Sequence, residues 1–257
     1  MADFSSRLKA SGIHLGLSAL IGLLAATLVL GLWYPWPYRV MSGGQSLFMI
    51  IVSVDLVLGP ALTFVAFNRD KARTVLVRDL AVITVLQACA LAYGLHVVFT
   101  ARPVALVFED RRFRVVAAID VLEAELPKAL PGLQRLSFTG PVLLGTRKPK
   151  DARENTESID YAFKGFDIGS RPSFWQPYAA SADTVLAAAR PLSQLYQRYP
   201  GSQRAIDQEL LRQRNAPGGD LANLKFLPVI SKEGNWCAVL DARSGALVGF
   251  IPYDGFF

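Results

Sequence analysis

Three long apolar runs occupy most of the first hundred residues of the chain. They cover Ile13 to Tyr34, Leu47 to Phe67 and Leu80 to Phe99, and the only charged residue inside them is Asp55. An α-helix rises about 1.5 Å per residue, so about 20 apolar residues cross a hydrocarbon core of about 30 Å. The pattern therefore predicts three transmembrane helices.

The first run has a competing interpretation as a signal peptide, because Arg7 and Lys9 precede it. The apolar region of a signal peptide is only about 7–15 residues long and leads to a small-x-small cleavage site. This run is longer, has no such site, and ends in the aromatic and proline-rich segment Trp33 to Tyr38. Such segments are typical of a membrane interface. We therefore expect the run to remain as a membrane span.

Positive charge is distributed unevenly over the segments that flank the runs. Two basic residues precede the first run and one lies between the first and second, whereas four lie between the second and third: Arg69, Lys71, Arg73 and Arg78. Loops rich in Lys and Arg stay in the cytoplasm. We expect a multi-pass protein of the bacterial inner membrane, with a cytoplasmic amino terminus and with everything after Arg102 in the periplasm.

The pattern changes after residue 101, where short β-rich and helical segments replace the long runs. The expected elements are a hairpin (103–108 and 112–119), a short helix capped by Asp120 (120–129), an exposed loop (145–158), two helices (183–198 and 202–214) and an antiparallel meander (225–230, 236–240 and 246–251). We expect a three-helix transmembrane domain at 1–101, followed by a periplasmic α+β domain with an antiparallel sheet at 102–257.

Composition agrees with a membrane protein and argues against nucleic acid as a partner. Hydrophobic residues make up 52% of the chain, and the mean hydropathy is +0.30. The formal charge of +6 arises largely at the ends of apolar runs, where positive charge sets orientation. Cys89 lies inside a run and Cys237 far outside it, so we expect no disulfide.

Catalytic motifs are missing from the sequence. The two histidines, His14 and His96, both lie near the ends of apolar runs, so neither a zinc site nor a Ser-His-Asp site can form after residue 101. The sequence also has no P-loop and no dinucleotide fingerprint. Carboxylates leave glycosidase-like chemistry open, although nothing pairs them. We expect a protein that is not an enzyme and that has no cofactor or metal.

Asp55 is the most informative polar residue, because a carboxylate near the centre of a span costs about 2.5–3.5 kcal/mol on insertion scales. It should therefore face protein or water. Two interpretations stay open: a contact with another membrane segment or a proton-linked switch, and an aspartate hydrogen-bonded within this protein. Gly59 and Pro60 follow one turn later, where a kink would free a backbone carbonyl.

Several other residues are candidates for partner contacts. Gly12 and Gly16 provide a small-residue surface suited to close helix packing, either with a partner or within the chain. We place His14 at the cytoplasmic boundary, and His96 at the outer interface rather than in a proton relay with Asp55. In the domain after residue 101, Trp175 and Tyr178 belong to an aromatic concentration that would form either core or a partner surface.

Six segments along the chain resemble the TfpX/TfpZ family of type IV pilin accessory proteins, also called FimB-like. They are Ala10-Ser-Gly-Ile-His-Leu15, Trp33-Tyr-Pro35, Asp55-Leu-Val-Leu-Gly-Pro60, Arg102-Pro-Val104, Phe113-Arg-Val-Val116 and Val239-Leu-Asp-Ala-Arg-Ser-Gly245. The resemblance runs over nearly the whole chain, and the order of these segments is more specific than any one of them.

The resemblance implies a non-enzymatic, chaperone-like protein that supports the stability, presentation or assembly of its cognate pilin. The implied partners are a type IV pilin, the pilus assembly machinery and inner-membrane lipid. Pilin helices of this class carry a glutamate near their start, which a protonated Asp55 could meet at matching depth. Two alternatives stay open: a membrane sensor or proton-linked component that uses Asp55, and a pilin-modifying membrane enzyme.

Overall fold

The computed structural model describes residues 2–214, 221 and 223–257. The chain divides into two compact units, one formed by residues 1–39 and 43–101, the other by residues 40–42 and 102–257. The first contains three helices that are long and apolar enough to cross a membrane, and the second contains helices and a sheet. This confirms the predicted fold class.

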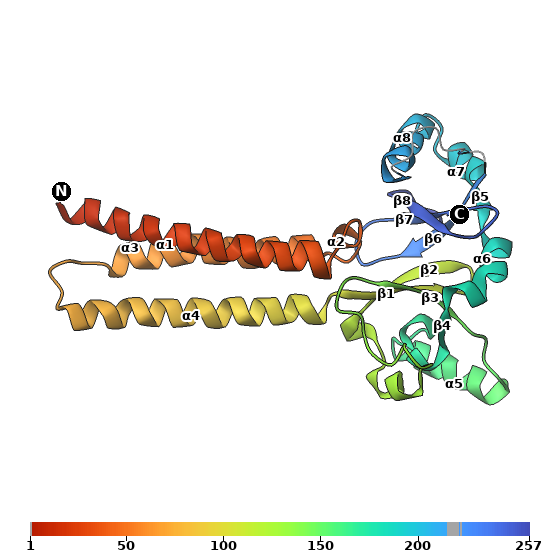
Figure 1. Cartoon of the computed structure of the whole chain (residues 1–257), viewed down its shortest axis with the longest axis horizontal. Coiled ribbons are helices and arrows are strands. Elements are labelled where there is room, and N and C mark those ends of the chain that lie inside the picture. The colour runs from red at the N-terminus through yellow and green to blue at the C-terminus, as the bar shows by residue number, and fades with distance from the viewer. Residues whose placement is uncertain (1, 215–220, 222) are drawn as a thin grey trace. The chain divides into compact units, whose positions relative to one another are not determined.

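Three long helices make up the first unit, which we call the three-helix unit. Helix α1 (Ala2–Ala26) continues into the π-helix η1 (Thr27–Trp33), and α3 (Gly44–Ala66) and α4 (Arg73–Thr100) complete the bundle. The short α2 (Tyr38–Met41) begins in this unit, and its residues from Val40 on belong to the second unit. Helix α3 packs against both α1 and α4 (Figure 1). The predicted apolar runs lie inside the candidate spans except for their last residues Tyr34 and Phe67, and the spans begin several residues earlier than the runs.

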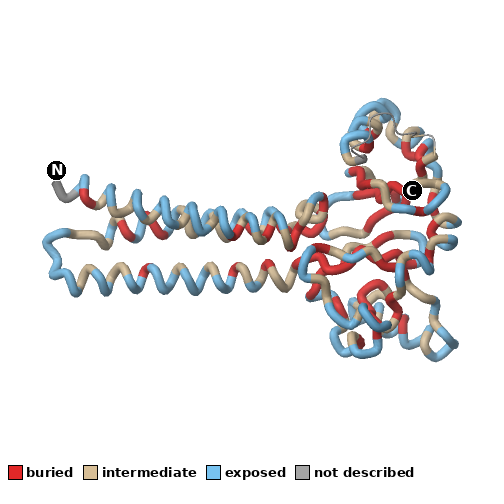
Figure 2. The backbone as a smooth tube through the Cα atoms, viewed as in Figure 1, coloured by how far each residue is buried: buried red, intermediate tan, exposed pale blue. Residues whose placement is uncertain are grey.

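A cluster of buried side chains surrounds Tyr34 in the three-helix unit. Its hydroxyl donates a hydrogen bond of 2.8 Å to the carbonyl of Val98, and a β-carbon at Gly44 would lie 2.2 Å from its ring. Only glycine therefore allows α3 to begin this close to the tyrosine. The buried residues here are Ala25, Val29, Trp33, Tyr34, Phe48 and Val98. Figure 2 shows that most of the remaining helix surface is exposed or half-buried, as expected for helices that face lipid.

In the second unit, which we call the sheet unit, the described residues include eight strands in one mixed sheet. The strand order is β4-β3-β1-β2-β6-β7-β8, and β5 pairs with β6. The bounds are β1 Pro103–Glu109, β2 Arg112–Ala117, β3 Val142–Thr146, β4 Trp175–Pro177, β5 Arg190–Pro191, β6 Leu224–Ile230, β7 Trp236–Asp241 and β8 Leu247–Ile251.

The predicted hairpin and the predicted meander are both present, as β1–β2 and β6–β7–β8. The sheet as a whole is not antiparallel throughout, because β1 pairs with β3 and β2 pairs with β6 in parallel. Parallel neighbours need a crossover connection between them. The sequence pattern predicted β1, β2, β6, β7 and β8. It did not predict β3, β4 or β5, nor which distant strands would become neighbours.

Short helices surround the sheet. The α-helices are α5 Ala152–Phe163, α6 Ala182–Ala188, α7 Leu192–Arg198 and α8 Gln203–Arg214. The 3₁₀ helices are η2 Ala118–Asp120, η3 Glu123–Lys128, η4 Ile168–Ser170, η5 Pro172–Phe174 and η6 Tyr178–Ser181.

Three of the predicted elements need correction. The helix expected at 120–129 is instead two 3₁₀ turns, and the side chain of Asp120 makes no capping bond. The loop expected at 145–158 contains the start of α5, which Asp151 caps by accepting a 2.7 Å bond from the backbone N–H of Glu154. The helix expected at 183–198 is divided by β5, which ends at Pro191, a residue that cannot continue a helix interior.

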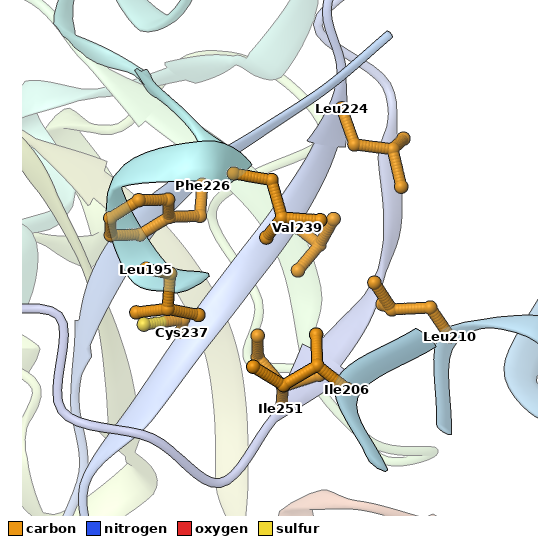
Figure 3. Close-up of a cluster of buried hydrophobic side chains, with 9 residues drawn as sticks. Leu195, Ile206, Leu210, Leu224, Phe226, Cys237, Val239 and Ile251 are labelled. Atoms are coloured by element: carbon orange, nitrogen blue, oxygen red, sulfur yellow. The ribbon is translucent and has the colours of Figure 1, made fainter. Parts of the chain in front are cut away.

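Two apolar clusters hold the sheet unit together. Helices α7 and α8 cover β6, β7 and β8, and Figure 3 shows Leu195, Ile206 and Leu210 meeting side chains from these strands. The second cluster joins β1, β2, β3 and β4 to the segment 118–136, through Val121, Leu126 and neighbouring residues. Both clusters bury apolar area on the sheet, which is the main favourable contribution to folding.

Candidate functional site

Two polar contacts join α1 to α3 inside the three-helix unit. The hydroxyl of Ser11 donates to the carbonyl of Pro60 at 2.8 Å, and Nδ1 of His14 lies 2.6 Å from the hydroxyl of Thr63. Ser11 and His14 lie about one turn apart on α1, and Pro60 and Thr63 lie about one turn apart on α3. The two contacts together therefore fix the register of α1 on α3. In lipid, such bonds stabilise helix association because no water competes for the polar groups.

Gln87 provides the matching polar contact between α3 and α4. Its side-chain amide donates to the backbone carbonyl of Asp55 at 3.3 Å, and it lies directly against Gly59. A β-carbon at Gly59 would lie 2.0 Å from Nε2 of Gln87. The glycine therefore makes room for the glutamine between the two helices.

These contacts leave an open groove with α1 and α4 as walls and α3 as floor, which we call the helix groove. It has a volume of about 450 Å³. Its lining is mostly apolar, with a few polar side chains on the floor and walls. The lining residues are Ala10, Ile13, His14, Leu17, Ser18, Ile21, Asp55, Thr63, Leu80, Thr84, Gln87, Ala88 and Leu91.

The side chain of Asp55 is the exceptional group in this groove. Asp55 also lines a smaller cavity of about 250 Å³ between α3 and α4. Its carboxyl group makes no hydrogen bond or ion pair with any residue that the structure describes. A carboxyl group in a membrane span needs a polar partner or water. The groove therefore offers an apolar surface and, on its floor, a carboxyl group to which no described residue hydrogen-bonds.

The other intramembrane candidates fall into two groups. Gly59, Pro60 and His14 make contacts within the chain, so His14 belongs to the α1–α3 packing. Gly12 and Gly16, in contrast, have no neighbouring atom within 4 Å of an added β-carbon, so they lie on an open face of α1. His96 is exposed on α4 and does not line the helix groove.

The two aromatic candidates of the sheet unit have structural roles. Trp175 is only 4% exposed, and its indole N–H donates to the carbonyl of Gly169 at 2.8 Å. Tyr178 is half-buried, and its hydroxyl donates to the carbonyl of Gly245 at 2.6 Å. The side chain of Trp175 therefore belongs to the core of the sheet unit, with its only donor satisfied, and a role as a periplasmic contact stays a prediction.

Three residues that make the polar contacts between the helices were not singled out by the sequence analysis as site residues: Ser11, Thr63 and Gln87. All three are polar residues inside or beside an apolar run, which is the signal that could have identified them. In the described part of the chain, no three His, Cys, Asp or Glu side chains gather where they could hold a metal ion.

The comparisons with known proteins give one matching family and three relatives. Residues 2–43 match the family described as fimbrial assembly protein FimB. The fimbrial assembly proteins of Dichelobacter nodosus serogroups I and E1 are 36% and 35% identical to this chain over 234 residues, which are 91% of this chain and 90% of each relative. The protein of serogroups C1 and C2 is 40% identical over 121 residues, which are 47% of this chain and 92% of that relative.

No solved structure matches the chain. The similarity to the two longer relatives extends over both the three-helix unit and most of the sheet unit, since it covers 91% of the chain. The match at residues 2–43 includes α1, with Ser11 and His14 that hold it on α3. The protein thus belongs to the FimB family of fimbrial assembly proteins.

Proposed function

We propose that this protein supports its cognate type IV pilin at the bacterial inner membrane, as a non-enzymatic, chaperone-like accessory protein in pilus assembly. The observation that carries the proposal is the helix groove, with the carboxyl group of Asp55 on its floor, to which no described residue hydrogen-bonds. Its relatives are named as fimbrial assembly proteins, which supports a role in the same process.

The groove has the features that a single transmembrane helix would need in a partner. Large apolar side chains such as Ile13, Leu17 and Leu91 line it, and the open glycines Gly12 and Gly16 lie on the same helix as one wall. Helices in lipid associate through close packing and hydrogen bonds rather than through the hydrophobic effect. A pilin helix in this groove would gain both.

Asp55 would supply the hydrogen bond. A pilin helix with a glutamate near its start could meet a protonated Asp55 as its hydrogen-bond partner, provided that the two residues lie at the same depth. A polar pair of this kind is worth about 1–2 kcal/mol in model membrane helices. It would thus hold the pilin helix without making the complex permanent.

The expected topology fits this role. The basic segment between α3 and α4 favours a cytoplasmic location for this loop. The sheet unit then lies in the periplasm, on the same side as the globular part of a pilin that waits in the inner membrane. The protein would offer surfaces to both parts of the pilin.

The first test combines gene deletion with site-specific crosslinking. We expect deletion to lower total pilin and surface pili, and a plasmid copy to restore both. A photo-crosslinking residue at Leu17, which lines the groove, should capture pilin. The matched control is Val65 on α3, which is 73% exposed but does not line the groove.

Two results would contradict the proposal. Normal pilin levels and normal piliation after deletion would exclude the accessory function. Equal capture of pilin from Leu17 and Val65 would exclude the groove as the contact surface while leaving a role in assembly intact.

A further inference from the structure

A second cavity, of about 490 Å³, lies within the sheet unit and shares no residue with the helix groove. Its walls are the loop between β6 and β7, the segment after β8 and the end of α7. We call it the aromatic pocket, because Tyr199, Trp236 and Tyr253 line it.

The three rings of the aromatic pocket are held in place by the fold. The rings of Tyr199 and Tyr253 lie 5.1 Å apart, and the hydroxyl of Tyr199 donates to the carbonyl of Asp254 at 3.2 Å. Trp236 is only 6% exposed, and its indole N–H donates to the carbonyl of Glu233 at 3.1 Å. A ligand would therefore meet rings that are already ordered, which reduces the entropic cost of binding.

Two carboxylates accompany the rings, and the pocket lining contains no lysine, arginine or histidine. Glu233 is exposed, and its carboxylate forms no ion pair with a described residue. Asp254 uses one carboxylate oxygen to accept a 2.9 Å bond from the backbone N–H of Phe256. Its other oxygen has no such bond to a described residue. Negative charge attracts a cation, and an aromatic ring attracts one that lies over its face.

We propose that the aromatic pocket binds an ammonium or guanidinium group, presented by a lysine or arginine side chain of a protein partner. Val40 and Pro252 add apolar surface for the methylene stem of such a side chain. The chain itself gives a precedent, since the guanidinium of the exposed Arg198 lies 5.7 Å from the ring centre of Tyr199 without lining the pocket.

The test uses the purified full-length protein in detergent, with 5-fluorotryptophan incorporated so that ¹⁹F NMR reports on Trp236. The probes are the peptide Gly-Gly-Arg-Gly-Gly, the same peptide with neutral citrulline in place of arginine, and free N-acetylarginine amide. We expect the arginine peptide to shift the Trp236 resonance saturably, and the citrulline peptide not to do so.

The double variant Glu233→Gln/Asp254→Asn should weaken binding of the arginine peptide about five- to tenfold, because each exposed ion pair contributes at most about 1 kcal/mol. The control Asp160→Asn removes an exposed carboxylate on α5 and should leave binding unchanged. Both changes are at exposed or half-exposed positions, and thermal unfolding of each variant verifies that it is folded.

Three results would overturn the proposal: no saturable shift, equal binding of the citrulline peptide, or no effect of the double variant. Tighter binding of free N-acetylarginine amide than of the peptide would overturn the assignment to a protein partner in favour of a small free cation. None of these results depends on pilin, so the proposal is tested separately from the proposed function.

Discussion

Arg171 and Glu125 form an ion pair that the sheet unit buries almost completely. Nη2 of Arg171 lies 2.5 Å from Oε1 of Glu125, and the two side chains are 3% and 4% exposed. Ser173 donates a further 2.6 Å bond to the other oxygen of Glu125. The guanidinium also lies over the rings of Tyr161 and Phe174, at 4.3 Å and 4.8 Å. The pair thus connects η3 to α5 and η5.

Glu125→Ala should destabilise the sheet unit by about 3–5 kcal/mol, because removing one partner leaves a buried charge uncompensated. The measurement is chemical unfolding of the full-length protein in detergent, followed by near-ultraviolet circular dichroism. Glu123→Ala is the matched control, since Glu123 is an exposed glutamate of the same 3₁₀ helix and should change stability by less than about 0.5 kcal/mol. Equal effects of the two substitutions on the free energy of unfolding would show that the buried ion pair stabilises the sheet unit no more than an exposed glutamate does.

The lowered pKa of Glu154 predicts how the stability of the sheet unit depends on pH. Hydrogen bonds from the guanidinium of Arg147 lower the pKa of Glu154 to about 2, and burial only partly opposes them. The ordinary pKa of glutamate in an unfolded chain is about 4.3. Because the folded pKa is the lower one, the stabilisation is present above about pH 4.3 and disappears as the pH falls towards 2.

We therefore expect the urea concentration at the unfolding midpoint to decrease as the pH is lowered from about 5 to about 2. This decrease should be smaller for Glu154→Gln. The exposed Glu123→Gln should keep the full pH dependence. An unchanged profile for Glu154→Gln would mean that the pair with Arg147 does not contribute to acid stability.

The spans could be predicted from sequence because a membrane imposes a length and a composition on each helix. The hairpin and the meander could be predicted because their strands are neighbours along the chain. The segment 120–129 could not, since its pattern suits a helix but Pro127 lies within it. There, the buried pair of Glu125 with Arg171 depends on a residue 46 positions away. Contacts of this separation leave no local signal.

The candidate site shows the same division. Asp55 could be identified because a carboxylate in a span is costly wherever it lies. The contact of His14 with Thr63 could not, because it depends on the register of α1 on α3, which composition does not specify. For Gly12 and Gly16 the sequence predicted a small-residue surface, and for Gly59 with Pro60 it predicted a kink. The fold decides that Gly59 is covered by Gln87 and that the other two lie open.

Gly59→Leu should destabilise the three-helix unit by about 1–3 kcal/mol, because the larger side chain would displace Gln87 from between α3 and α4. Thermal unfolding of the purified protein in detergent measures the effect. Gly16→Leu is the control, since an added β-carbon there meets no atom within 4 Å. If Gly59→Leu were as stable as Gly16→Leu, the close approach of Gln87 to α3 would be incorrect.

Substitutions at Asp55 distinguish a contact with pilin from a role in packing within the three-helix unit. Asp55→Leu removes the only carboxyl group among the residues that line the helix groove, and no described residue hydrogen-bonds to that group. We expect the variant to remain folded, with pilin recovered by co-purification reduced about five- to tenfold, the equivalent of about 1–1.4 kcal/mol. Asp55→Asn, which keeps a hydrogen-bonding group in place, should retain most of the recovery.

The matched control for Asp55→Leu is Ser53→Leu, which lies two residues earlier on α3 and whose hydroxyl bonds only to its own helix, at the carbonyl of Ile50. It adds the same side chain without touching the groove, so pilin recovery should not change. Full recovery with Asp55→Leu would remove Asp55 from the contact with pilin. Thermal unfolding at a lower temperature, together with poor recovery, would instead assign Asp55 to packing within the three-helix unit.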